Sequence, residues 1–216
     1  MLTLSTWRAR FDPLSDAPAV ARRTGGQIAG LLAQNYGWYR HEGDLVLPED
    51  TDLDVSLVVD GDLVVHGFLD DWVSGTGMLV VLGDLVLRDL VSWGSVHVTG
   101  DLRAHGIVHS VYNDHVFEVG GAVHARALVL SDKSADYRTG EVEAEIDPYY
   151  PTRAQLRAAR GILVPQVYDG WRRRAAEGRP PKLRRPSYDR VRSRLHRDKP
   201  LFREDPPTAT GSRPRH

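Results

Sequence analysis

The stretch LVVLGDLVLRDLVSWGSVHVTGDLRA, residues 79–104, decides the fold, because it holds two copies of one short unit. The unit is a Gly, usually an acidic residue and then apolar residues at alternate positions, as in Gly83-Asp84-Leu85-Val86-Leu87. Six copies of the unit, about 20 residues apart, begin at Gly43, Gly61, Gly83, Gly100, Gly121 and Gly140. A Gly-punctuated repeat of this length, rich in Val and Leu, is typical of a solenoid whose coils stack on one another.

Apolar residues alternate with other residues within each repeat, which is the pattern of strands that bury one side. They recur four and two residues before the Gly, two and four residues after it and again seven residues after it, so each coil should contain three short strands. We therefore predict a mainly β fold, a single-stranded parallel β-helix of about six coils over residues 43–146, with a right-handed winding. The repeated Gly is expected at a corner, where a residue without Cβ can take a positive φ.

The two ends of the chain do not carry the repeat. Residues 1–42 are expected to form a helical cap over the first coil, because an open solenoid end is an exposed strand edge. We expect residues 147–181 to form a second cap with short helices, and residues 182–216 to form a basic, largely disordered tail with a transient helix near residues 189–197. Residues 1–146 hold 10 Lys and Arg against 22 Asp and Glu, whereas the rest holds 18 against 7. Such asymmetry favours an interaction segment.

The composition limits both the chemistry and the cell compartment. Because the chain has no Cys, disulfides and thiolate metal sites are excluded, and we expect a cytoplasmic protein. No apolar run approaches ~20 residues, so we expect neither a membrane span nor a signal peptide. Hexapeptide acyltransferases need a strict six-residue period, and sugar-cleaving β-helices are usually much longer chains with a charged groove. We therefore expect no enzymatic activity, no cofactor and no metal.

Two rows of charged residues should repeat on the outside of the solenoid. The first row, directly after the Gly, consists of Asp44, Asp62, Asp84, Asp101 and Glu141. It could bind Ca²⁺, but an Asp beside a turn Gly more often bonds backbone, and we favour that structural use. The second row, five residues after the Gly, consists of His66, Arg88, His105 and Arg126. It could bind an anion or an acidic partner, although we favour a simple offset of the aspartate row a few residues away on the surface.

Differences in repeat length gather at one corner, between the third strand of one coil and the first strand of the next. Insertions in repeat proteins collect on one face, which is often the binding face. We predict that partner contacts there are made by Trp72, Trp93, Tyr112, Asp114 and His115. The alternative is that the two Trp side chains fold down and cover core strands. His109, His115 and Asp114 are the best candidates for a catalytic or zinc site, but the spacing of the two histidines fits no common zinc motif, and we favour a solvated loop or a protein contact.

The repeat is similar to that of bactofilins, bacterial cytoskeletal β-helix proteins. More closely, it resembles an uncharacterised bacterial family of β-solenoid proteins often labelled polymer-forming. The resemblance covers roughly residues 40–181 and rests on segments 98–104, 112–114, 163–169 and 177–180. It implies a β-solenoid without known catalysis, and some members of the closer family lie near toxin and immunity genes. Unlike bactofilins, this chain has irregular coils and extra elements at both ends, which weighs against end-to-end polymerisation.

These observations favour a non-enzymatic structural or interaction protein. One form is a bactofilin-like scaffold that self-associates through the solenoid ends or through an apolar flank made of Val46, Val64 and Val86. The other is an immunity-type or adaptor protein that binds a partner protein through the solenoid edge, with charge steering the association. Nucleic-acid binding through the basic tail is a third and less favoured possibility.

Overall fold

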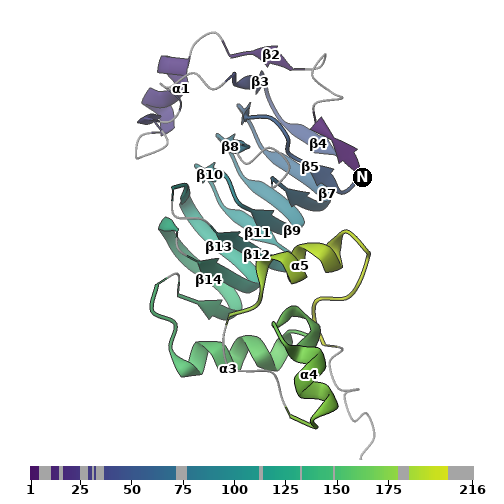
Figure 1. Cartoon of the computed structure of the whole chain (residues 1–216). Helices are drawn as coiled ribbons and strands as arrows, with labels where there is room; N and C mark the ends of the chain where they lie inside the picture. The colour runs from purple at the N-terminus through teal and green to yellow at the C-terminus, as the bar shows by residue number, and fades with distance from the viewer. Residues whose placement is uncertain are drawn as a thin grey trace, which may run out of the picture.

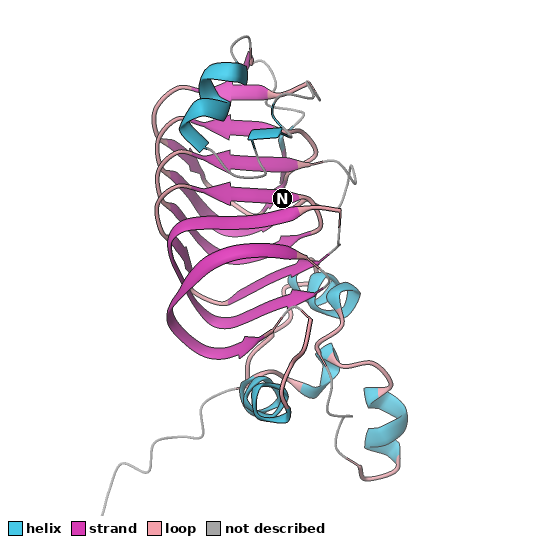
Figure 2. Ribbon diagram, turned by 90° about the vertical axis from the view of Figure 1, so that its left-hand side faces the viewer, coloured by secondary structure: helices cyan, strands magenta, loops and turns pink. Residues whose placement is uncertain are grey.

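The computed structural model describes residues 1–4, 11–14, 17–24, 29–30, 32, 37–71, 77–111, 114–131, 133–147, 149–179 and 185–203. They form a stack of parallel β-coils with short strands and a helix at one end and further helices at the other (Figure 1). Seen from the side, the coils lie one above another along a single axis (Figure 2). The predicted β-solenoid of about six turns is thus confirmed. Its right-handed winding stays a prediction.

Each coil has three sides, and each side is part of a continuous, mostly parallel sheet. The first face contains β3 (Tyr39–His41), β6 (Leu57–Val59), β8 (Met78–Val81), β10 (Ser95–Val98) and the start of β13 (Val116–Ser131). The second face contains β4 (Leu45–Leu47), the first halves of β7 (Leu63–Asp70) and β9 (Leu85–Ser92), then β11 (Leu102–Ala104) and the middle of β13. The third face contains β5 (Thr51–Asp52), the second halves of β7 and β9, then β12 (Ile107–Val111) and the end of β13. The last strand, β14 (Ser134–Ile146), follows β13 along all three faces.

Inward side chains of equivalent residues stack from coil to coil and form the core. Leu63 pairs in register with Leu85, Leu85 with Leu102, and Leu102 with Val123. All four side chains are fully buried. Because every coil repeats the same inward positions, apolar columns run along the axis and supply most of the burial that stabilises the stack.

Four of the six repeated glycines lie where successive coils approach each other closely. Among all six only Gly43 has a positive φ, 79°, so the expected reason for glycine is wrong at the other copies. At Gly83 an added Cβ would lie 2.2 Å from Asp62 Oδ1 and 2.8 Å from backbone atoms of Gly61. The same obstruction by an Asp of the preceding coil occurs at Gly61, Gly100 and Gly121. Glycine is needed there because a side chain would occupy the space of the neighbouring coil.

The Asp that follows each of these glycines joins one coil to the next. Asp62 N donates to Asp44 Oδ1 at 2.8 Å, and Asp84 N donates to Asp62 Oδ1 at 2.7 Å. In the same way, Asp101 N donates to Asp84 Oδ1, and Ala122 N donates to Asp101 Oδ1, each at 2.8 Å. We call Asp44, Asp62, Asp84 and Asp101 the aspartate ladder. As favoured from the sequence, these carboxylates accept hydrogen bonds from the backbone. The backbone that they bind belongs to the following coil and not to their own turn.

The described part of residues 1–42 closes the first coil mainly by strand pairing. Strand β1 (Leu2–Thr3) pairs with β5, and β2 (Asp12–Pro13) pairs antiparallel with β3. Helix α1 (Ala17–Thr24) places Val20 in a buried cluster that also contains residues of the first face. The cap therefore differs from the expected helical one in two respects. Two strands contribute to it, and residues 39–41 already belong to the solenoid.

The C-terminal region packs on the third face and on the last coil. Helix α3 (Arg153–Ile162) begins with a capping box between Thr152 and Gln155, and α4 (Trp171–Ala176) follows the short η3 (Pro165–Val167). Helix α5 (Tyr188–Leu195) buries Tyr188, Val191 and Leu195 in a cluster that includes third-face residues. Within residues 182–216, which we expected to be largely disordered, α5 therefore lies at the place of the expected transient helix, but it is packed on the solenoid. No helix of the described segments has the length and apolar character needed to span a bilayer.

Replacement of Gly83 by Ala should lower the free energy of unfolding by about 1–3 kcal/mol, because the new Cβ overlaps Asp62 and the Gly61 backbone. The matched control is Gly161→Ala in α3, where no atom lies within 4 Å of an added Cβ. This control should raise stability by roughly 0.5–1 kcal/mol through helix propensity. Urea unfolding of both variants checks the prediction, and equal effects of the two substitutions would contradict it.

Candidate interaction surface

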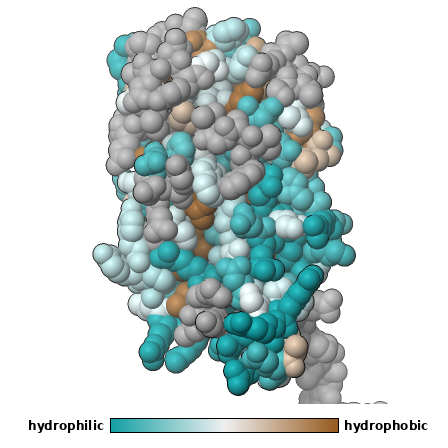
Figure 3. Space-filling model, viewed as in Figure 1, coloured by the Kyte–Doolittle hydropathy of each residue, from teal (hydrophilic) through white to brown (hydrophobic). Residues whose placement is uncertain are grey.

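The second face is the side of the solenoid that the described terminal segments leave open. The first face is covered in part by the cluster of Val20, Leu32 and Trp38, and the third face by the C-terminal helices. On the second face, outward Val46 is 54 % exposed and belongs to none of the buried clusters. Figure 3, which shows the Figure 1 orientation, has hydrophilic residues gathered at its lower right, over α4 and α5.

An apolar stripe runs along the first three coils of this open face. Val46 pairs in register with Val64, and Val64 pairs with Val86. We call these three residues the valine stripe; Val64 and Val86 are half-buried. In the next coils Arg103 and then His124 take the equivalent position, so the stripe ends after the third coil. Apolar side chains in a row on an outer sheet face are unusual for a solvated surface and mark a site for contact.

The aspartate ladder borders the valine stripe, and most of its negative charge is uncompensated. Asp101 has Arg103 at 2.5 Å and His124 at 4.0 Å. No Lys, Arg or His side chain of the described residues lies within 4 Å of the carboxylates of Asp44, Asp62 or Asp84. Each of these three uses Oδ1 as the acceptor for the next coil. Their charge is therefore available to a partner beside the first three coils.

The basic row on the other border of the face is largely neutralised within the chain. Arg88 contacts Asp89 at 3.0 Å and Asp50 at 3.2 Å. Arg126 contacts Glu143 at 2.9 Å, and its guanidinium lies 4.2 Å from the Phe202 ring. His66 and His105 of the same row are exposed. The expected offset of the aspartate ladder is therefore wrong for the two arginines, because the acids that they contact lie outside the ladder.

We call the corner at which the repeat lengths differ the variable corner. The structure describes three of the five residues that we predicted as partner contacts there. Trp93 is half-buried, and its ring lies 5.7 Å from the Tyr188 ring of α5 in a T-shaped contact. Asp114 is exposed, while His115 is half-buried with Nδ1 3.1 Å from Ser95 Oγ. Trp72 and Tyr112 lie outside the described residues. Trp93 therefore has a packing role against α5, and a partner contact at this corner stays a prediction.

Buried charges hold the variable corner together beneath these side chains. Asp71 accepts hydrogen bonds from Ser92 Oγ at 2.7 Å and from Gly94 N at 3.0 Å. Lys133 donates to Gly94 O and, at 2.8 Å, to Ser110 Oγ. Burial raises the pKa of Asp71 and lowers the pKa of Lys133 to about 8, while each charge favours the ionised form of the other. The backbone of Gly94 thus lies between Asp71 and Lys133, which are both fully buried.

The two histidines considered for a catalytic or zinc site do not share a partner. His109 is buried on β12 with its ring 5.4 Å from that of Tyr188, whereas His115 bonds Ser95. Burial, and then the charge of Arg185, lowers the pKa of His109 to about 3. His109 is therefore a neutral packing residue beneath α5 at ordinary pH.

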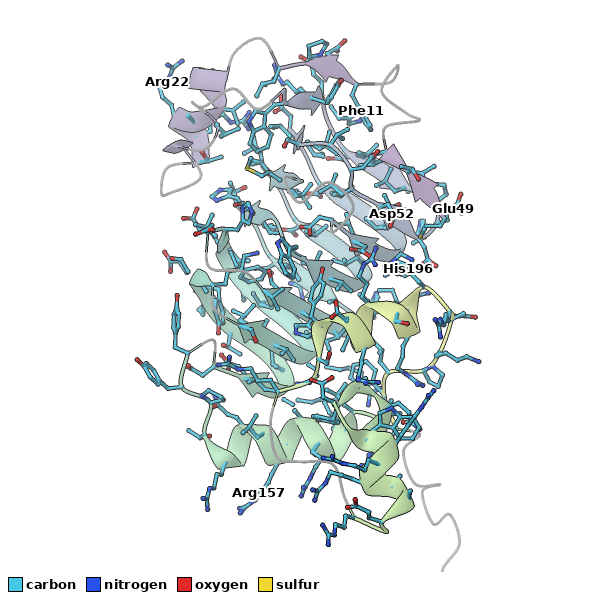
Figure 4. All side chains as sticks on the ribbon, in the orientation of Figure 1. Phe11, Arg22, Glu49, Asp52, Arg157 and His196 are labelled. Atoms are coloured by element: carbon cyan, nitrogen blue, oxygen red, sulfur yellow. The ribbon has the colours of Figure 1, made fainter. Side chains whose placement is uncertain are left out.

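A polar cluster that the sequence did not reveal lies where α5 crosses the third face. Asp52 and Asp70 are buried, and His196, just after α5, lies close to both. Figure 4 labels Asp52 and His196 of this cluster. The two aspartates are register partners on adjacent coils, so their spacing by one repeat was a signal that could have been read. His196 carries no such signal, because no repeat places it.

No protein-family model matches this chain, and no curated protein and no solved structure is significantly similar to it. The resemblance to bactofilins and to polymer-forming β-solenoid proteins therefore carries no assignment. Function has to be argued from the surface and the clusters themselves.

Replacement of His109 by Phe should make the free energy of unfolding fall less steeply as the pH is lowered. The folded-state pKa of about 3 lies below the ordinary value of 6.5, so below pH 6.5 the unfolded chain binds a proton that the folded chain does not. The stability contributed by neutral His109 is complete above pH 6.5 and is lost toward pH 3, by up to about 1.4 kcal/mol per pH unit. Urea unfolding between pH 7 and pH 4.5 checks this, with exposed His66→Gln as control. Parallel pH profiles for wild type and His109→Phe would contradict it.

Proposed function

We propose that this chain is a non-enzymatic interaction protein, and that its second face binds a partner protein. The observation that carries the proposal is the valine stripe beside three uncompensated carboxylates, on the one face that the described terminal segments leave open. A rigid solenoid suits this task because its coils fix the spacing of the contact residues, so little conformational entropy is lost on binding.

The partner that fits this surface presents apolar side chains flanked by Lys or Arg. Equivalent residues of successive coils lie ~4.8 Å apart, so the ladder offers a line of regularly spaced negative charges. Charges at the border of an interface mainly steer the approach and set its specificity. The apolar contact at the stripe would supply the area that is removed from water. This is the chemistry of an adaptor or immunity-type protein with a basic partner.

Lateral self-association is the second candidate, because an apolar stripe can also pack against a copy of itself. End-to-end stacking of the bactofilin kind has less support. Strands β1 and β2 pair with the first coil, and α3 contacts β14 of the last coil. A scaffold built from this chain would therefore grow through the second face. Sedimentation of tag-free protein at physiological salt separates the candidates, since a monomer excludes the lateral scaffold.

The test of partner binding compares two changes on the second face. Val46→Asp places a charge on the exposed end of the stripe. The triple variant Asp44→Asn, Asp62→Asn and Asp84→Asn removes three charges but keeps an oxygen acceptor for each ladder hydrogen bond. Proteins retained by the immobilised wild type from its native host are identified, and the affinity for the purified partner is then measured at two salt concentrations.

Val46→Asp should weaken binding at least about 10-fold, since hot-spot losses commonly exceed 1.4 kcal/mol. The triple Asn variant should slow association and lose most of the salt dependence. Tyr150→Asp is the control, because Tyr150 is 87 % exposed outside the second face. Wild-type affinity in both second-face variants would overturn the proposal.

A further inference from the structure

Two buried aspartates are stacked on the third face in adjacent coils. Asp52 ends β5, Asp70 ends β7, and the two are register partners. Asp52 is 6 % exposed and Asp70 is fully buried. Like charges on neighbouring strands repel each other, and buried charges are costly unless a cation compensates them. This position therefore requires positive charge from elsewhere in the chain or from solution.

Helix α5 and the residue that follows it bring two basic side chains to the pair. Arg192 Nε lies 2.5 Å from Asp70 Oδ2, and His196 Nε2 lies 2.5 Å from the same oxygen. The His196 ring also packs on the Phe68 ring, with 4.9 Å between the ring centres. These contacts fix the imidazole over the two aspartates. They connect residues that lie more than 120 positions apart in the chain.

The compensation is one-sided, because both basic groups contact Asp70. Asp52 Oδ1 is buried and has no hydrogen-bond partner among the described residues. One carboxylate oxygen of each aspartate and one ring nitrogen of His196 lie within 4.8 Å of one another. Asp52 thus brings a buried carboxylate with an unpartnered oxygen to a second carboxylate and an imidazole, which is an arrangement that a small cation would complete.

We propose that Asp52, Asp70 and His196 bind one divalent transition-metal ion, with Zn²⁺ as the best-matched ion. Two carboxylate oxygens and one imidazole nitrogen are ligands that Zn²⁺ accepts. The imidazole disfavours Ca²⁺ and Mg²⁺, which prefer oxygen ligands. On binding, His196 Nε2 would offer its lone pair to the ion in place of its contact with Asp70 Oδ2. Arg192 keeps its contact with Asp70 and orients that carboxylate.

The site is open enough for an ion to enter from solution. The side chains of His196 and Arg192 are 21 % and 26 % exposed, while the aspartates lie beneath them. The bound ion would join the first coil, the second coil and the segment that follows α5. Its structural effect would be to fasten the C-terminal helix onto the third face.

The test is titration of tag-free, full-length protein with Zn²⁺ by isothermal calorimetry after treatment with a chelator. Wild type should bind one Zn²⁺ per chain and melt at a higher temperature with Zn²⁺ than with the chelator. Co²⁺ should give visible absorption bands that report an imidazole-containing site, and excess Mg²⁺ should not displace it.

Asp52→Asn and His196→Gln should each weaken Zn²⁺ affinity about 100-fold or more, because loss of a direct ligand costs at least as much as loss of an orienting contact. Asp52→Asn keeps the shape of the side chain, and circular dichroism confirms folding. His196→Gln decides the question if the first variant does not fold. His66→Gln, an exposed histidine of the second face, is the control and should bind as wild type does. Absence of binding by wild type, or unchanged binding in both ligand variants, would overturn the proposal.

Discussion

The hydrogen bond from a backbone N–H of one coil to the Asp Oδ1 of the coil before it is the interaction on which this structure depends. It satisfies a corner amide that no strand ladder would pair, and it fixes the offset between neighbouring coils. The bond is possible only because glycine precedes each corner amide and leaves room for the carboxylate. With the corner set in this way, the apolar columns fall into register, and both edges of the second face become straight lines of equivalent residues.

The sequence predicted the coils well because periodicity is a local signal that six copies repeat. Once the glycines were aligned, Leu63, Leu85 and Leu102 occupied the same position of the repeat, and the structure stacks them in register. The reason for the glycines was harder to predict, since a close approach between coils and a positive φ demand the same residue. Only coordinates distinguish the two causes, and they favour close approach at Gly61, Gly83 and their equivalents.

The elements that cover the third face could not be predicted from the repeat pattern. Tyr188, Val191 and Leu195 are three apolar residues in a strongly basic segment, so composition favoured disorder there. Their burial depends on apolar third-face residues such as Ile107 and Val129, which the repeat places far away in sequence. The same holds for the candidate metal site, where Asp52 and Asp70 follow the repeat but His196 arrives only through tertiary packing.

The contact of α5 with the second coil changes how the molecule should come apart. In an ordinary solenoid each repeat touches only its neighbours, so the array can fray progressively from either end. Here residues 192 and 196 are tied to residue 70, and β12 and β13 lie under the same helix. Peeling of the early coils therefore requires detachment of the C-terminal segment as well. A chain assembled from nearly independent repeats acquires the all-or-none cooperativity of a globular domain, at the cost of a high contact order and slower folding.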